Sequence, residues 1–399
     1  MNVNSYKDLN LIKYTAALSF LIFFNYFLWS INSWEIVKSI NFLLLLSVFF
    51  YFFISKKYND YWFLKIIIIL LLLICLGSPT TAWDARSIYL FSAKRLFYES
   101  NLYIFFDNYF AVGMNAFPKL PATLSATFAQ LIGFWNEIFP KSTNVIVILP
   151  PILFLISFFK KKLLMLIWLF LMLLFSGKLL ISGLMDGIIA LYFVGSILAV
   201  YQISCTKNEG EKKIFYLILF LFFTILSLCK NEGAVFVLVI LFSGTLIDFL
   251  YEKKINYQLW LIVAISLIPI LFWKYMIIRN NIITEYIQYD PVNRVISRIT
   301  NPEDLLNIIL NIVKNEKLIF SLILFIFFAY KKFEVNKKLI FFVLINFLLC
   351  LAIFIGSFLL TPFDLLWTLS ASSVRIYISL VLLLSYFSIF LVEKKYYDK

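Results

Sequence analysis

The chain has 399 residues, of which 63% are apolar and only 14% are charged, whereas a soluble domain is about half apolar and about a quarter charged, so a water-soluble globular enzyme is excluded. The absence of histidine also excludes histidine metal sites, Ser-His-Asp triads and histidine proton relays. A net charge of +13 in so apolar a chain indicates membrane topology and lipid headgroups, with no nucleic-acid partner.

Apolar segments long enough, or nearly long enough, to cross about 30 Å of hydrocarbon recur along the chain. No soluble domain, linker rich in Gly, Ser or Pro, or fixed-period repeat interrupts them. The sequence therefore predicts one all-α, polytopic membrane domain over residues 1–399, with about twelve transmembrane helices. The expected spans are 14–32, 39–55, 61–78, 144–159, 163–178, 186–204, 213–229, 234–251, 258–275, 318–330, 338–361 and 375–392.

The short connectors predict the orientation of the chain. Lysine clusters fall on one side, which the positive-inside rule makes the cytoplasm: Lys56-Lys57, Lys160-Lys161-Lys162, Lys212-Lys213, Lys253-Lys254, Lys331-Lys332, Lys337-Lys338 and Lys394-Lys395. The arginines all fall on the opposite side: Arg86, Arg95, Arg279, Arg294, Arg298 and Arg375. The bias toward Lys, Asn, Ile and Phe suggests an AT-rich bacterial genome. We therefore expect a multi-pass protein of the bacterial cytoplasmic (inner) membrane whose functional face points outward.

Two outer segments, 79–143 and 276–317, are long. Both alternate aromatic or aliphatic residues with charged ones, which is typical of helices that lie in the membrane interface. Interfacial helices are therefore expected in these loops, and membrane lipids are expected partners.

The first outer segment opens with charged residues at the membrane boundary, where each charge is costly and becomes a candidate for function. Asp84 lies in the stretch Trp83–Leu90, and Arg86 and Lys94 follow it. In one interpretation Asp84 only caps a helix that begins at Ala85. In the other, Asp84 is a general base, and Arg86 and Lys94 bind an anion.

Three later segments bring further charges to the same face. Asp186 opens the sixth span, Lys230-Asn231-Glu232-Gly233 joins the seventh and eighth, and Thr361–Thr368 with Arg375 precedes the last. Taken singly, they read as a helix cap, a hairpin turn and an ordinary loop. The predicted threading nevertheless gathers distant charges on one face, which suits acid–base chemistry on a phosphorylated substrate: Asp84, Asp186, Lys230, Glu232, Asp364 and Arg375.

Together these segments resemble the bacterial GT-C glycosyltransferases that use polyprenyl-phosphate sugars, a group similar to the dolichyl-phosphate-mannose mannosyltransferases. Trp83–Leu96 resembles the family's Asp-Ala-x-x-Ile-Tyr…Ala-Lys opening, and Met185–Gly187 its second Asp-bearing turn. Lys230–Gly233 resembles its Lys-Asn-Glu-Gly element, and Thr361–Arg375 its Thr-Pro-x-Asp-Leu-x-Trp-His…Asp-Arg end. Each of these four segments is short, but their order along the chain and their placement on one membrane face match those of the family. Thr368 and Val374 stand where the family usually has His and Asp.

The resemblance implies a GT-C fold and an inverting hexosyl- or pentosyltransferase on the outer face. Its donor would be a polyprenyl-phosphate-linked sugar, and its acceptor a cell-envelope glycan, lipid or protein. Asp84 would be the base, Lys230, Arg375, Arg86 and Lys94 would bind the donor phosphate, and Asp186, Glu232 and Asn231 would orient the sugar or the cations. Asp364 would fix Arg375. No cofactor is expected; a divalent metal is known in distant relatives, but nothing in the sequence demands one.

Two alternatives remain open at this point. A polysaccharide polymerase or ligase would use polyprenyl-pyrophosphate glycans, and the outer arginines are compatible with it. A lipid-linked sugar flippase or transporter fits the number of helices, although such proteins tend to show two related halves and helices broken by Gly or Pro near the midplane. This chain has 11 Gly and 10 Pro, and no similarity between its halves is visible.

Overall fold

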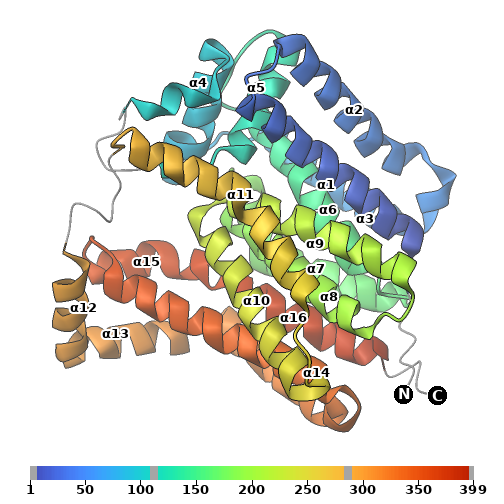
Figure 1. The fold of residues 1–399 in the computed structure, drawn as a ribbon, viewed down its shortest axis with the longest axis vertical. Helices are drawn as coiled ribbons and strands as arrows, with labels where there is room; N and C mark the ends of the chain where they lie inside the picture. Colours follow the sequence, from blue (N-terminus) through green and yellow to red (C-terminus); the bar gives the residue numbers. More distant parts are fainter. Residues whose placement is uncertain (1–6, 108–115, 283–289, 395–399) are drawn as a thin grey trace.

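The structure is a computed structural model that describes residues 7–107, 116–282 and 290–394. Lys395 and parts of both outer segments (108–115 and 283–289) lie outside the described residues. Every regular element in the described ranges is a helix (Figure 1). The α-helices are α1 Leu9–Ser30, α2 Glu35–Ile54, α3 Trp62–Gly77, α4 Phe91–Glu99, α5 Leu120–Ile132, α6 Thr143–Ile156, α7 Lys162–Ile181, α8 Asp186–Cys205, α9 Glu209–Cys229, α10 Asn231–Glu252, α11 Tyr257–Arg279, α12 Pro291–Thr300, α13 Pro302–Val313, α14 Glu316–Leu360, α15 Leu365–Ile376 and α16 Ile378–Lys394. Short 3-10 helices (η1 Lys56–Tyr61, η3 Leu102–Phe106, η5 Phe139–Ser142) and one π-helix (η2 Ala85–Leu90) complete the described part.

Eleven helical segments within the described residues are long and apolar enough to cross a membrane. This confirms the prediction of a polytopic all-α membrane protein. The expected span 318–330 is helical, but it is not one of these eleven. It forms the first part of α14, a helix of 45 residues whose backbone departs from helical geometry at Asn336.

The connectors predicted to share the lysine-rich side do lie together. Lys7 pairs with Glu211 (Nζ–Oε2 3.0 Å), and Lys162 pairs with Asp60 (Nζ–Oδ1 2.7 Å). These contacts join connectors that are separated in the chain by about one hundred to two hundred residues. The opposite ends of the helices therefore form a second, separate face.

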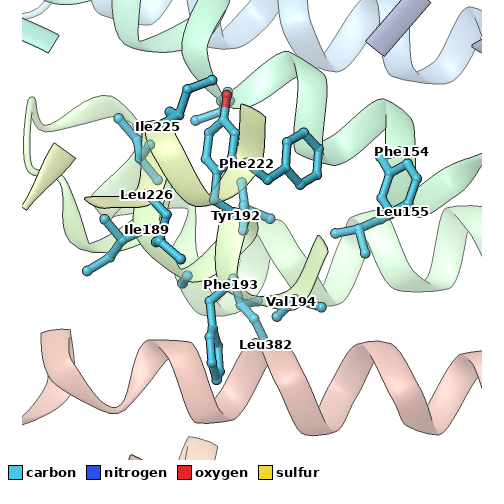
Figure 2. Close-up of a cluster of buried hydrophobic side chains, with 14 of the residues drawn as sticks. Phe154, Leu155, Ile189, Tyr192, Phe193, Val194, Phe222, Ile225, Leu226 and Leu382 are labelled. Atoms are coloured by element: carbon cyan, nitrogen blue, oxygen red, sulfur yellow. The ribbon is translucent and has the colours of Figure 1, made fainter. Parts of the chain in front are cut away.

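Helix α8 is the buried centre of the bundle and packs against α6, α9, α10 and α16 (Figure 1). Figure 2 shows the rings of Tyr192 and Phe222 beside each other and Phe193 directed toward α16. The centroids of the Tyr192 and Phe222 rings are 5.0 Å apart. Because lipid tails are as apolar as these side chains, close packing rather than exclusion from water holds such helices together. The first residue of this rigid helix is Asp186, so the packing fixes the position of that carboxylate.

Helices α12 and α13 lie at the left edge of Figure 1 and expose apolar side chains such as Val292 and Ile296, as interfacial helices do. Arg298 on α12 is buried and donates hydrogen bonds to the carbonyl oxygens of Phe358 and of Phe363, the latter at 2.8 Å. Carbonyls at a helix C-terminus lack partners within the helix and attract cations. Arg298 thus ties α12 to the corner between α14 and α15.

Gly233 allows α10 to begin directly against α9. A Cβ atom at this position would lie 1.9 Å from the carbonyl oxygen of Leu226, which is backbone and cannot rotate away. We expect Gly233→Ala to lower the free energy of unfolding by at least about 1–3 kcal/mol, the usual cost of overpacking. Gly356 on α14 is the matched control, because a Cβ there meets no atom within 4 Å. Thermal unfolding in detergent checks this; equal melting temperatures for the two variants would contradict it.

Lys119 is a buried lysine outside the membrane spans. Its Nζ donates to the Ser92 hydroxyl at 3.1 Å, and burial, aided by the charges of Arg95 and Lys274, lowers its pKa from 10.5 to about 7. Between these two pH values the unfolded chain holds one more proton than the folded chain, so stability rises with pH, by at most about 1.4 kcal/mol per pH unit. We expect Lys119→Met to remove this rise. Melting temperatures of both proteins measured at about pH 7 and about pH 9 test it; parallel curves would contradict it.

Candidate active site

Five charged side chains from four separate segments form one connected network on the face opposite the lysine-rich connectors. Lys230 Nζ lies 2.9 Å from Glu232 Oε1 and 3.0 Å from Asp186 Oδ1. Arg375 contacts the other oxygen of Asp186 through Nε at 3.1 Å and Nη2 at 3.0 Å, and its Nη2 also pairs with Asp84 Oδ2. The order is Glu232–Lys230–Asp186–Arg375–Asp84, which we call the ion-pair network.

The local fold of each segment aims its side chain into this network. Asp84 stands just before the π-helix η2, at the position of a helix cap, yet its carboxylate makes no capping bond and contacts Arg375 instead. Asp186 is the first residue of α8, where the helix dipole favours a negative charge. Lys230 is extended (φ −158°, ψ 153°) between α9 and α10, and Arg375 lies in the last turn of α15. Helix capping therefore does not explain Asp84.

Burial divides the network into an inner and an outer part. The Asp186 and Lys230 side chains are 3% and 10% exposed, whereas Asp84 is 25% and Glu232 47% exposed. Burial alone would lower the pKa of Lys230, but Asp186 and Glu232 outweigh it and hold that pKa well above its usual value. Lys230 therefore stays cationic at neutral pH.

A cavity of about 170 Å³ opens onto the network and continues between α10, α14, α15 and α16. Its charged end is formed by Asp186, Lys230, Glu232 and Arg375. Most of its other lining residues are apolar: Ile189, Val235, Phe236, Ile353, Phe354, Phe358 and Ile376. A site with a charged end and an apolar remainder suits a ligand that carries an anionic group on a lipid.

Hydroxyl groups to which the sequence analysis gave no role also line the cavity: Ser357, Thr361, Thr368 and Ser379. Thr361 and Thr368 flank the segment already singled out, and their hydroxyl oxygens lie 3.4 Å apart. Ser357 and Ser379 sit inside apolar spans, where serine usually bonds only to its own helix, so no signal distinguished them. Tyr89 is a further neighbour: burial and the nearby carboxylates raise its pKa well above normal, so it stays protonated.

Arg86 and Lys94 do not reach this cavity. They line a separate groove beside it, together with Trp83 and Glu137, and Lys94 pairs with Glu137 at 3.1 Å. The expectation that both cations join Lys230 and Arg375 at one site is corrected, because Arg86 and Lys94 line a different groove from the one that Lys230 and Arg375 line.

Asp364 and Asn231 are not members of the network either. The Asp364 carboxylate caps α15 by accepting the Trp367 N–H at 2.8 Å, and the carboxylates that hold Arg375 are Asp84 and Asp186. The expectation that Asp364 fixes Arg375 is corrected for this reason. Asn231 begins α10 and is not part of the cavity wall.

Comparison of the chain with protein-family models, with curated proteins and with solved structures finds no match. The described residues contain no group of three or more His, Cys, Asp and Glu side chains arranged to hold a metal ion. The ion-pair network and the cavity beside it are therefore the features that indicate a function.

Proposed function

We propose that this protein is an inverting glycosyltransferase of GT-C type, which moves a sugar from a polyprenyl-phosphate-linked donor to a cell-envelope acceptor at the outer face of the cytoplasmic membrane. The observation that supports this most is the junction of the ion-pair network with an apolar cavity. A lipid-linked donor combines the same two features, a charged phosphate and a long apolar chain.

In this proposal Lys230 and Arg375 bind the donor phosphate. Both contact the same buried carboxylate, Asp186, through opposite oxygens, so the two cations are held at fixed positions on either side of it. Fixed cations stabilise the negative charge that develops on a departing phosphate without having to reorganise during the reaction. The hydroxyls of Thr361 and Thr368 lie in the same cavity and are suited to bind polar groups of the sugar or phosphate.

Asp84 is the proposed general base. It is the network carboxylate that comes from the outer segment, and it is partly exposed. Its carboxylate takes the proton of an acceptor hydroxyl while that oxygen attacks the anomeric carbon from the side opposite the phosphate. The bond between the anomeric carbon and the phosphate oxygen breaks, its electrons leave with the polyprenyl phosphate, and the anomeric configuration is inverted.

Two other functions make different demands on this site. A polymerase or ligase that uses a pyrophosphate-linked glycan must balance a second phosphate, but Arg375 is the only one of the described arginines that lines the cavity. A flippase or transporter should concentrate charges near the middle of the membrane, whereas this network joins helix ends at one face.

The experiment that tests the proposal does not require the sugar to be known. Cells that lack this protein should accumulate a polyprenyl-monophosphate-linked sugar in their lipid extracts, because the donor is still made but no longer used. Mass spectrometry of those extracts identifies the sugar. Wild-type protein should reverse the accumulation, and Asp84→Asn should not. Accumulation of a pyrophosphate-linked glycan would support the polymerase or ligase instead, and unchanged lipids would contradict a donor role for either lipid.

A further inference from the structure

The two outer carboxylates of the ion-pair network occupy the positions that an anionic ligand would need. Asp84 contacts Arg375, and Glu232 contacts Lys230. Both are more exposed than Asp186, which lies between the two cations and makes three contacts with them. Asp84 has one ion-pair contact, with Nη2 of Arg375, and Glu232 has one, with Nζ of Lys230. Both outer carboxylates are therefore more easily displaced than Asp186, and Asp84 is the one that lies on Arg375.

We infer that the donor phosphate displaces Asp84 from Arg375, and that this exchange releases the Asp84 carboxylate to act as a base. This inference rests on the proposed function and adds the regulation of the same site. While no donor is bound, Asp84 and Arg375 neutralise each other, so neither is available for catalysis. When a phosphate oxygen replaces the carboxylate on the guanidinium, the charge-assisted hydrogen bond is kept and Asp84 becomes free. The donor therefore binds before the acceptor hydroxyl can be activated.

The charges of the network also indicate which phosphate fits. Asp186, Lys230 and Arg375 together carry a net charge of +1, and the two outer carboxylates bring the whole network to −1. A phosphodiester has one negative charge, the same as the Asp84 carboxylate that it replaces on Arg375, so the exchange leaves the net charge of the site unchanged. A pyrophosphate diester has two charges and leaves one unbalanced in a poorly solvated site, which is costly. The site therefore matches a lipid phosphodiester with a single phosphate.

The test compares the affinity of purified protein in detergent for one probe, undecaprenyl methyl phosphate, a singly charged lipid phosphodiester that contains no sugar. Asp84→Asn removes the competing charge and should bind the probe about tenfold more tightly than wild type, because a charge-assisted contact no longer has to be broken. Glu232→Gln should also bind more tightly, because it frees Lys230, and provides a second variant should Asp84→Asn fold poorly.

Asp364→Asn is the matched control. It removes the same charge from an exposed residue on the same face, keeps a side chain that caps helices well, and touches neither Lys230 nor Arg375. Its affinity for the probe should equal that of wild type. Equal tightening in Asp84→Asn and Asp364→Asn would show an effect of overall charge and overturn the inference, as would an unchanged affinity in Asp84→Asn. Failure of all these proteins to bind the probe would contradict the proposed function itself.

Discussion

Asp84→Asn is expected to lower the rate of sugar transfer by about 10²- to 10⁴-fold, the usual contribution of a general base, while the protein stays folded. The amide has nearly the shape of the carboxylate and still accepts a hydrogen bond from Arg375, but it cannot take up the acceptor proton. With the donor identified from the accumulated lipid, the rate is measured as polyprenyl phosphate released per unit time. This readout is independent of the acceptor's identity.

The same assay on Asp364→Asn provides the control for loss of an acidic side chain on this face, and its rate should stay near that of wild type. The combination with binding data is informative: Asp84→Asn should bind a lipid phosphate more tightly and yet turn over far more slowly. A rate within a factor of a few of wild type would place the base elsewhere in the molecule.

Asp186→Ala should be the most destabilising change in the ion-pair network. It leaves Lys230 and Arg375 facing each other without the carboxylate that both contact. Removing one partner of a buried ion pair typically costs about 3–5 kcal/mol, because the remaining charge stays desolvated. We therefore expect a large drop in melting temperature in detergent, with retention of helical circular dichroism below that temperature.

Glu232→Ala is the comparison for this experiment. Its carboxylate is 47% exposed, and exposed ion pairs contribute about 0–1 kcal/mol, so its melting temperature should change little. Similar losses in the two variants would mean that Asp186 is no more important to the fold than a surface carboxylate.

The membrane-spanning helices and the grouping of the site were predictable from sequence for the same physical reason. A backbone that crosses lipid must satisfy its own hydrogen bonds, so each long apolar run becomes a helix, and successive helices alternate direction. The alternation forces the residues that follow or precede given spans onto a known face. Asp84, Asp186, Lys230 and Arg375 were therefore expected on one face, and the structure joins them.

The positions of these side chains relative to one another within that face were not predictable in the same way. Knowing the membrane face of a loop does not show which helix the loop covers. Arg86 and Lys94 were therefore grouped with Lys230 and Arg375, although they do not line the same cavity. Asp364 had two physically reasonable roles, cap or ion-pair partner, and only the geometry shows that it caps α15. The expected spans 318–330 and 338–361 correspond to the two parts of α14, which a kink at Asn336 separates within the polar connector.

Two threonine hydroxyls in the cavity bear on the proposed reaction. Thr368 lines the cavity at the position where the resembled family usually has a histidine, and Thr361 faces it. A hydroxyl binds and orients polar groups but does not exchange protons near neutral pH as imidazole does. We therefore propose that the proton is transferred by Asp84 and not by the residue at position 368.

The most direct measurement compares two lipids on the detergent-purified protein: undecaprenyl methyl phosphate, a singly charged monophosphate diester, and undecaprenyl methyl pyrophosphate. A ligand that binds only the folded state stabilises it by about 2.7 kcal/mol at a hundredfold excess over its Kd. We predict a larger rise in melting temperature with the monophosphate, and loss of that rise in Lys230→Ala and Arg375→Ala. A larger rise with the pyrophosphate would favour a polymerase or ligase. No rise with either lipid would contradict a phosphate-binding role for the network and favour transport.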